Sequence, residues 1–134
     1  MLVSGEGRAT TRVDPVTLAT TTVVPGGGTV WGQGGELWVT RHGLLSRLDE
    51  PTARAYALPA AVTTAVAVGP DSVWLLTQTS GDRPSELRRI DARTRQPVGA
   101  PITVGLTAVA VVADGDGAWV GNFADRTITR VTPR

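Results

Sequence analysis

The stretch that decides the fold reads GAWVGN at residues 117–122 and is followed, after a short gap, by TITRV at residues 127–131. Both parts are short, rich in β-branched or aromatic side chains and bounded by turn-forming residues, which is typical of β-strands. The same two-part unit occurs at residues 36–49 and again at residues 72–91. The unit is therefore a repeated strand–turn–strand motif, and a repeat of this kind predicts a modular fold.

Two kinds of residue mark the repeat. Arginine followed by an aliphatic residue recurs at steps of 35, 42 and 41 residues, and tryptophan recurs at steps of 36 and 45 residues. A four-stranded propeller blade needs about 40 to 45 residues, so the spacing predicts one blade for each repeat. The repeat positions are Arg12, Arg47, Arg89, Arg130, Trp38, Trp74 and Trp119.

The repeat divides the chain into four segments. Residues 1–24 form an incomplete blade, residues 28–58 and 64–103 form full blades, and residues 107–131 form a blade that lacks its outer strand. In the third segment we expect strands at 64–68, 73–77 and 87–91, and an outer strand around 96–103. The predicted fold is all-β: a partial propeller of about three and a half four-stranded antiparallel blades. Met1 then falls inside a strand, and closed propellers have about four to eight blades, so we expect a piece of a larger ring.

Three turns between strands share the pattern Asp-x-x-Thr, at residues 14–17, 49–52 and 91–94. An aspartate side chain can accept a hydrogen bond from the backbone N–H two residues on, and a threonine hydroxyl can close such a turn. The alternative is that the repeated carboxylates line up as a metal site. The turn cap is favoured because the repeat places the three aspartates in different blades.

Composition excludes several classes of function. The 41% hydrophobic and 19% charged residues are typical of a globular protein. The net charge of +1 gives no strong attraction to nucleic acid or to an anionic membrane. The chain has no cysteine and one histidine, so we expect no disulfide, no metal site and no cofactor. No apolar run approaches the roughly 20 residues of a membrane span, and residues 1–8 do not resemble a signal peptide, which leaves the compartment open.

Several of these motifs carry a family resemblance. The segments AVAV (65–68), WVGN (119–122), TITRV (127–131) and DPVT (14–17) resemble the repeats of YVTN-type and virginiamycin B lyase-like β-propellers in their actinobacterial versions. The resemblance implies a larger ring, often extracytoplasmic or attached to a regulator or kinase. The lyases of that group use histidines, a glutamate and Mg²⁺. One histidine and scattered acids do not reproduce that set, so no catalytic residue is assigned here.

The tryptophans are interpreted as packing between neighbouring blades rather than as an aromatic ligand box. The arginines are interpreted as packing their aliphatic stems and pairing locally, with an anion-binding row as the alternative. Loops at one face of a propeller usually bind ligands, and His42 lies in such a loop. The candidate ligand-binding residues of this face are Arg41, His42, Gln78, Asn122 and Asp125.

The glycine-rich segment 26–35 does not predict a phosphate-binding loop, because a strand rather than a helix is expected to follow it and the chain has no lysine. Three hypotheses for function remain open. The first is a non-catalytic recognition or scaffold module, the C-terminal piece of a larger propeller, with an unknown ligand or protein partner. The second is the remnant of a lyase-like enzyme, and the third is a short chain that self-associates through its open blade edges into a multi-chain ring.

Overall fold

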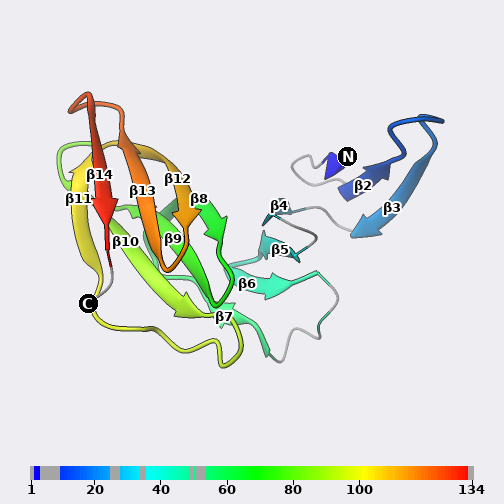
Figure 1. Cartoon of the computed structure of the whole chain (residues 1–134), viewed down its shortest axis with the longest axis horizontal. Coiled ribbons are helices and arrows are strands. Elements are labelled where there is room, and N and C mark those ends of the chain that lie inside the picture. The colour runs from blue at the N-terminus through cyan, green and yellow to red at the C-terminus, as the bar shows by residue number, and fades with distance from the viewer. Residues whose placement is uncertain are drawn as a thin grey trace. The chain divides into compact units, whose positions relative to one another are not determined.

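A computed structural model of the chain describes residues 2–3, 10–24, 28–33, 36–48, 50 and 54–132. These residues form β-strands and turns, with no α-helix among them, so the all-β prediction is confirmed (Figure 1). The chain consists of two compact units, Met1–Ala57 and Leu58–Arg134. Each unit contains two antiparallel sheets built from strands that follow one another in sequence, as expected for part of an open β-propeller.

The first unit holds a three-stranded and a four-stranded sheet. The strands β1 (Leu2–Val3), β2 (Thr10–Val13) and β3 (Thr20–Val24) form the first sheet in that order. The second sheet contains β4 (Thr29–Gln33), β5 (Glu36–Arg41), β6 (Leu44–Arg47) and β7 (Tyr56–Ala57). In the first sheet, Leu2 of β1 lies opposite Arg12 of β2.

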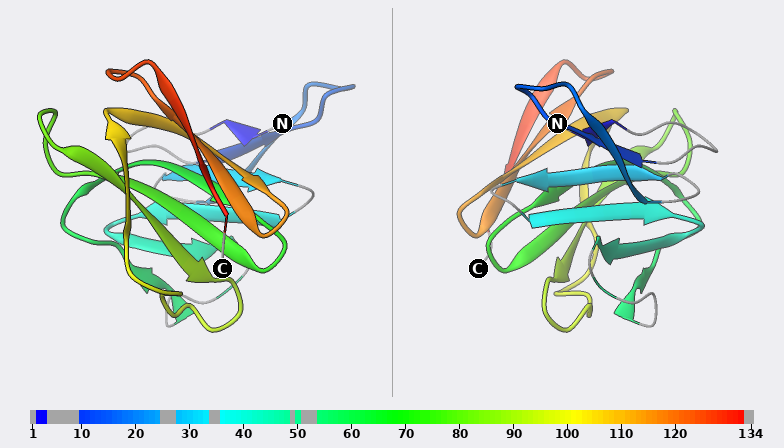
Figure 2. Two further views of the ribbon diagram at one scale, coloured as in Figure 1. Left: turned by 60° about the vertical axis from the view of Figure 1, so that its left-hand side comes forward. Right: turned by 90° about the vertical axis from the view of Figure 1, so that its right-hand side faces the viewer.

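The second unit also contains one four-stranded and one three-stranded antiparallel sheet. Its first sheet contains β8 (Val62–Val68), β9 (Ser72–Gln78), β10 (Pro84–Asp91) and β11 (Ile102–Leu106). Its second sheet contains β12 (Ala108–Asp114), β13 (Gly117–Asn122) and β14 (Thr127–Val131). Strand β12 packs against β8 and β9, so the two sheets lie as neighbouring layers (Figures 1 and 2).

Strand β9 is the best-buried element of the second unit. Six of its seven residues are buried, and Leu75 and Leu76, which point to opposite faces, are both fully buried. A strand that is buried on both faces reads as a continuous apolar run instead of an alternating one, which explains the sequence VWLL at residues 73–76.

The joint between the two sheets of the second unit is held by hydrogen bonds at the first residue of β12. The backbone N–H of Ala108 donates to the hydroxyl of buried Ser85 at 3.1 Å, and the hydroxyl of Thr64 donates to the carbonyl of Ala108 at 3.1 Å. At the other end of the strand, a Cβ added to Gly69 would lie 3.4 Å from the Cβ of Ala113. The sheets therefore meet closely along the length of β12.

The largest differences from the predicted strand boundaries are in β10 and β11. Strand β10 begins at Pro84 rather than at residue 87, and the outer strand β11 covers Ile102–Leu106 rather than residues 96–103. Only an isolated bridge, Ile90 to Pro97, forms in the expected place. Pro97 and Pro101 lack the N–H that a ladder needs, and Gly99 has a φ of +76°, so the regular outer strand forms only after Pro101.

The aspartate turn cap is confirmed at both turns that the structure describes. The Oδ1 atom of Asp14 accepts from the N–H groups of Val16 and Thr17 at 2.8 and 3.0 Å. Asp91 repeats this geometry with the N–H groups of Arg93 and Thr94 at 2.9 and 2.8 Å. The fifth residue of each turn has positive φ, at Leu18 and Arg95. The third expected turn, at residues 49–52, lies outside the described residues apart from Glu50.

The glycine-rich segment is a strand pair where the structure describes it. Strands β4 and β5 pair antiparallel, with Trp31 opposite Trp38, while residues 25–27 and 34–35 lie outside the described residues. Among the described residues, none belongs to a helix with the length and apolar character needed to cross a membrane.

Candidate functional site

The tryptophan and arginine signals of the sequence form one structural feature. In each of three sheets, a tryptophan on the second or middle strand lies opposite an arginine on the next strand, in the same cross-strand row. The strand on the other side adds a third residue to the row. The three rows are Trp31–Trp38–Arg47, Ala67–Trp74–Arg89 and Val112–Trp119–Arg130.

Two of these rows are stacked pairs of the same kind. The guanidinium carbon of Arg89 lies 5.4 Å from the ring centroid of Trp74, and that of Arg130 lies 5.1 Å from the centroid of Trp119. Both distances are within the range of a cation–π contact. The Nε atom of Arg89 also donates to the hydroxyl of Ser72 at 2.7 Å. The arginine thus covers one side of each indole and fixes its position on the sheet.

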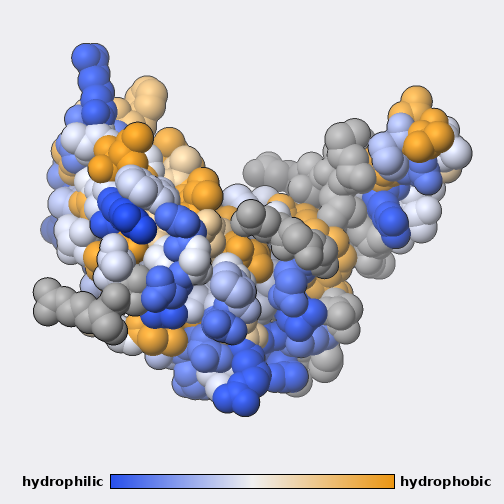
Figure 3. Space-filling model, in the orientation of Figure 1, coloured by the Kyte–Doolittle hydropathy of each residue, from blue (hydrophilic) through white to orange (hydrophobic). Residues whose placement is uncertain are grey.

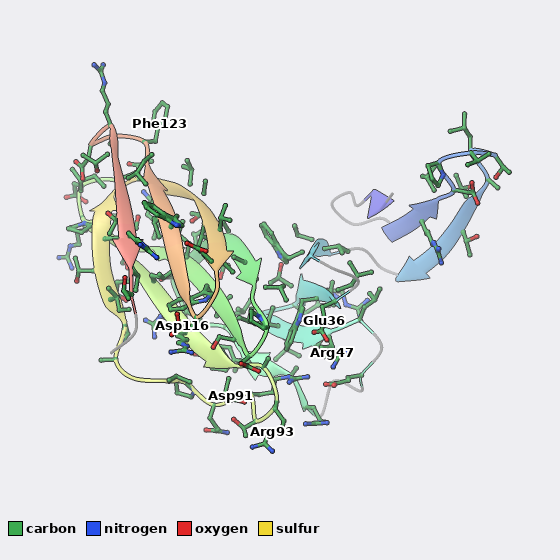
Figure 4. All side chains as sticks on the ribbon, in the orientation of Figure 1. Glu36, Arg47, Asp91, Arg93, Asp116 and Phe123 are labelled. Carbon is green, nitrogen blue, oxygen red and sulfur yellow. The ribbon has the colours of Figure 1, made fainter. Side chains whose placement is uncertain are left out.

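Arg47 and Arg130 also form ion pairs with acidic side chains. Arg130 lies 3.7 Å from the carboxylate of Asp114, which also accepts a 2.9 Å hydrogen bond from the indole N–H of Trp119. Arg47 lies 3.5 Å from Glu36, and the two side chains lie side by side in Figure 4. These contacts are partly exposed, and exposed ion pairs contribute little to stability. Their main effect is to orient the arginine along its row.

The burial of the three tryptophans does not follow the sequence expectation in full. Trp38 and Trp74 are 0% and 1% exposed, whereas Trp119 is 40% exposed. Trp74 lies on the face of its sheet that β12–β14 covers, as the contacts of Gly69 with Ala113 and Ser85 with Ala108 show. On the β12–β14 sheet, the face that carries Trp119 is bare among the described residues. The same repeat position therefore has two environments.

The loop end of this last sheet is braced by two of the candidate residues. Asn122 is 3% exposed, its Oδ1 accepts from the N–H of Gly105 at 2.9 Å, and its Nδ2 donates to Thr127 and Thr129. The carboxylate of Asp125 accepts from the N–H of Leu106 at 2.7 Å. The structure thus brings Asn122 and Asp125 together around the end of β11, where their side-chain oxygens accept hydrogen bonds from backbone N–H groups.

The close approach at this brace requires a glycine. A Cβ added to Gly105 would lie 2.5 Å from Cγ of Asn122 and 2.6 Å from the carboxylate of Asp125, which is closer than any real Cβ contact. Two further backbone bonds, from Phe123 N–H to Thr107 and from Ala124 N–H to Leu106, complete the connection. The β13–β14 loop is therefore held rigidly on the end of β11.

The other candidate residues lie at strand ends elsewhere. In the first unit, Arg41 ends β5 and is half-buried, and His42 is exposed in the turn to β6 with a φ of +50°. In the second unit, Gln78 ends β9 and is half-buried. Their role as ligand contacts stays a prediction.

The sequence reasoning missed an apolar hollow beside the braced loop. The hollow has a volume of about 610 Å³, and its lining includes Val109, Gly121, Asn122, Phe123, Arg126 and Ile128. Phe123 is 73% exposed and projects from the β13–β14 loop (Figure 4). Figure 3 shows hydrophobic residues at the surface over these strands. The signal in the sequence was the chain's one phenylalanine placed directly after a strand, in a loop where an apolar residue is unexpected.

The carboxyl groups with shifted pKa values lie in turns and accept hydrogen bonds there. Hydrogen bonds from the backbone N–H groups of Thr17 and Thr94 lower the pKa values of Asp14 and Asp91 respectively, and a hydrogen bond from Ser80 lowers that of Asp82. Each effect stabilises a carboxylate that is already charged at neutral pH. Within the described part of the chain, no three histidine, cysteine, aspartate or glutamate side chains are grouped so that they could hold a metal ion.

A scan of the chain against protein-family models finds no match, and a search of curated proteins finds none either.

Proposed function

We propose that the chain is a non-catalytic recognition module of the β-propeller type that binds a peptide segment in the hollow beside the β13–β14 loop. The observation that supports this proposal is the exposure of Phe123 on a rigid loop. Phe123, Ile128 and Val109 are exposed together, and exposed apolar patches with an aromatic residue are typical of interaction sites.

The chemistry of the lining defines the expected ligand. Val109, Phe123 and Ile128 offer an apolar surface for one side chain of the ligand. Arg126 adds a cationic group to the lining. A short segment with an apolar residue next to an acidic residue fits both features. Because the loop is already fixed by Asn122 and Asp125, binding requires little ordering of the protein.

A random peptide library displayed on phage tests the proposal. Selection on the immobilised chain is expected to enrich peptides in which an apolar residue adjoins Asp or Glu. Phe123→Ala should weaken their binding by about 30-fold or more, as expected for a buried aromatic contact. Arg126→Ala should remove the acidic preference while keeping the apolar one.

The matched control is Val98→Ala, which truncates an exposed apolar side chain in the connection between β10 and β11. It should leave the affinity unchanged. The proposal fails if selection enriches no peptides, or if the enriched peptides bind the Phe123→Ala variant as well as the unaltered chain.

A further inference from the structure

The uncovered face of the β12–β14 sheet is a second surface, which overlaps the hollow at Gly121 and Ile128. It is made of the row Val112–Trp119–Arg130 and the neighbouring row Ala110–Gly121–Ile128. Val112 is 59% exposed and Ile128 is 73% exposed.

The same molecule contains a covered copy of this face. Ala67, Trp74 and Arg89 of the β8–β11 sheet occupy the register positions of Val112, Trp119 and Arg130. The irregularity in the first strand of each sheet also falls at the same place, between Thr63 and Ala65 and between Ala108 and Ala110. What covers the first copy is therefore a template for what fits the second.

The Trp74 face is covered by the β12–β14 sheet, and burial shows which face of that sheet makes the contact. The β12–β14 sheet packs with the face that carries Ala118, Val120 and Val131, all of which are buried. Val120 lies opposite Thr129 and Ala118 lies opposite Val131. A docking partner for the Trp119 face should present a sheet with small and β-branched residues in this register.

The first sheet of this chain has that register. In β1 and β2, Val3 lies opposite Thr11 and Leu2 lies opposite Arg12, just as Val120 lies opposite Thr129 and Trp119 lies opposite Arg130. Thr11 and Val13, in the positions of Thr129 and Val131, are only half-buried, and the facing residues Thr20 and Thr22 are exposed. The chain therefore carries both the bare face and a sheet that matches its cover.

We infer that the Trp119 face binds the β1–β3 sheet of a second copy of this chain. The contact joins two different surfaces, so it is a head-to-tail association.

Sedimentation equilibrium of the 134-residue chain, between about 1 and 100 µM, tests this inference. The average mass of the unaltered chain should rise above the monomer mass as concentration rises. Val112→Arg and Thr11→Arg each place a charge in the contact and should each weaken association about 100-fold or more. Val98→Arg is the control, because Val98 is exposed outside both surfaces and its change should leave the association constant unaltered.

Mixing the two variants separates head-to-tail from face-to-face association. The Thr11→Arg copy keeps an intact Trp119 face and the Val112→Arg copy keeps an intact β1–β3 face, so an equimolar mixture should recover a 1:1 pair. Circular dichroism checks that each variant retains its sheets, and Thr22→Arg replaces Thr11→Arg if that variant does not. A monomeric unaltered chain overturns the inference, as does a Thr11→Arg variant that associates normally.

The two proposals are tested with different variants. Val112→Arg should leave binding of the selected peptides unchanged, and Phe123→Ala should leave the association of copies unchanged. A failure of one proposal therefore does not appear as a failure of the other.

Discussion

The two sheets of the second unit have the same plan and different surroundings. The β8–β11 sheet is buried on both faces of its strand β9, whereas the β12–β14 sheet buries Ala118 and Val120 and exposes Val112 and Ile128. Both carry an arginine stacked on a tryptophan at the same register. The difference shows that the repeat fixes how a sheet is built, while its neighbours decide what each copy contributes to stability.

The largest expected effect comes from the two tryptophans. Trp74→Ala should reduce the free energy of unfolding by about 3–5 kcal/mol, because it leaves a cavity between two sheets. Trp119→Ala should cost about 1 kcal/mol, since it removes a partly exposed stack and one hydrogen bond. Urea titration on the Thr11→Arg background, in which copies do not associate, measures both values. Equal losses would show that the two sheets do not differ as described.

The next largest difference is expected between Asn122, the last residue of β13, and Thr77, which has the matching position in β9. Asn122→Ala should cost about 2–3 kcal/mol, because it leaves the N–H of Gly105 and two threonine hydroxyls without a buried partner. At the matching position of β9, Thr77→Val should cost about 1 kcal/mol, since Thr77 makes one long bond of 3.4 Å to the carbonyl of Glu86. Thermal unfolding followed by circular dichroism compares them. A larger loss at Thr77 would contradict the brace at β11.

Two glycines test the contact between β11 and the β13–β14 loop by steric overlap instead of by loss of hydrogen bonds. Gly105→Ala should destabilise the fold by about 1–3 kcal/mol, because its Cβ would overlap Asn122 and Asp125. Gly121→Ala is the matched control, since its Cβ would lie 3.7 Å from that of Ala110, an ordinary contact. The control should change stability by no more than about 0.5 kcal/mol. If the two variants unfold at the same temperature, the end of β11 is not packed on the β13–β14 loop.

The smallest effect is a pH dependence that only one of the two sheets should show. The turn after β10 is capped by Asp91, whose pKa lies below the ordinary value of 3.8, whereas Thr132 follows Val131 in the last sheet. Because the folded pKa is depressed, the stabilisation is present above pH 3.8 and is lost as pH falls through the folded pKa. Asp91→Asn should therefore flatten the acid side of the stability profile slightly. An NMR titration midpoint of Asp91 at or above 3.8 would exclude this effect.

Much of the local plan was readable from the sequence. The strands at Trp38, Trp74 and Trp119 and the Asp14 and Asp91 turns follow from short-range patterns, because a strand or a turn is fixed by neighbouring residues. The start of β11 was displaced because Pro97 and Pro101 interrupt a ladder whose register depends on β10.

The candidate site was less accessible to sequence reasoning. That tryptophan and arginine form one row depends on strand register, and a slip of one residue would place them on opposite faces. The exposure of Trp119 depends on what covers its sheet, which no local pattern contains. The hollow arises because Gly121 occupies the register position where the preceding sheet has Leu76, a comparison that requires both sheets to be aligned in space.

Fluorine NMR of the chain labelled with 5-fluorotryptophan tests the central claim most directly. Resonances are assigned with single tryptophan-to-phenylalanine variants on the Thr11→Arg background, and each is compared in H₂O and D₂O. The account predicts a clear solvent isotope shift for Trp119 and none for Trp74, since only the first has a face open to water. A shift at Trp74 equal to that at Trp119 would contradict the packing of one sheet on the other.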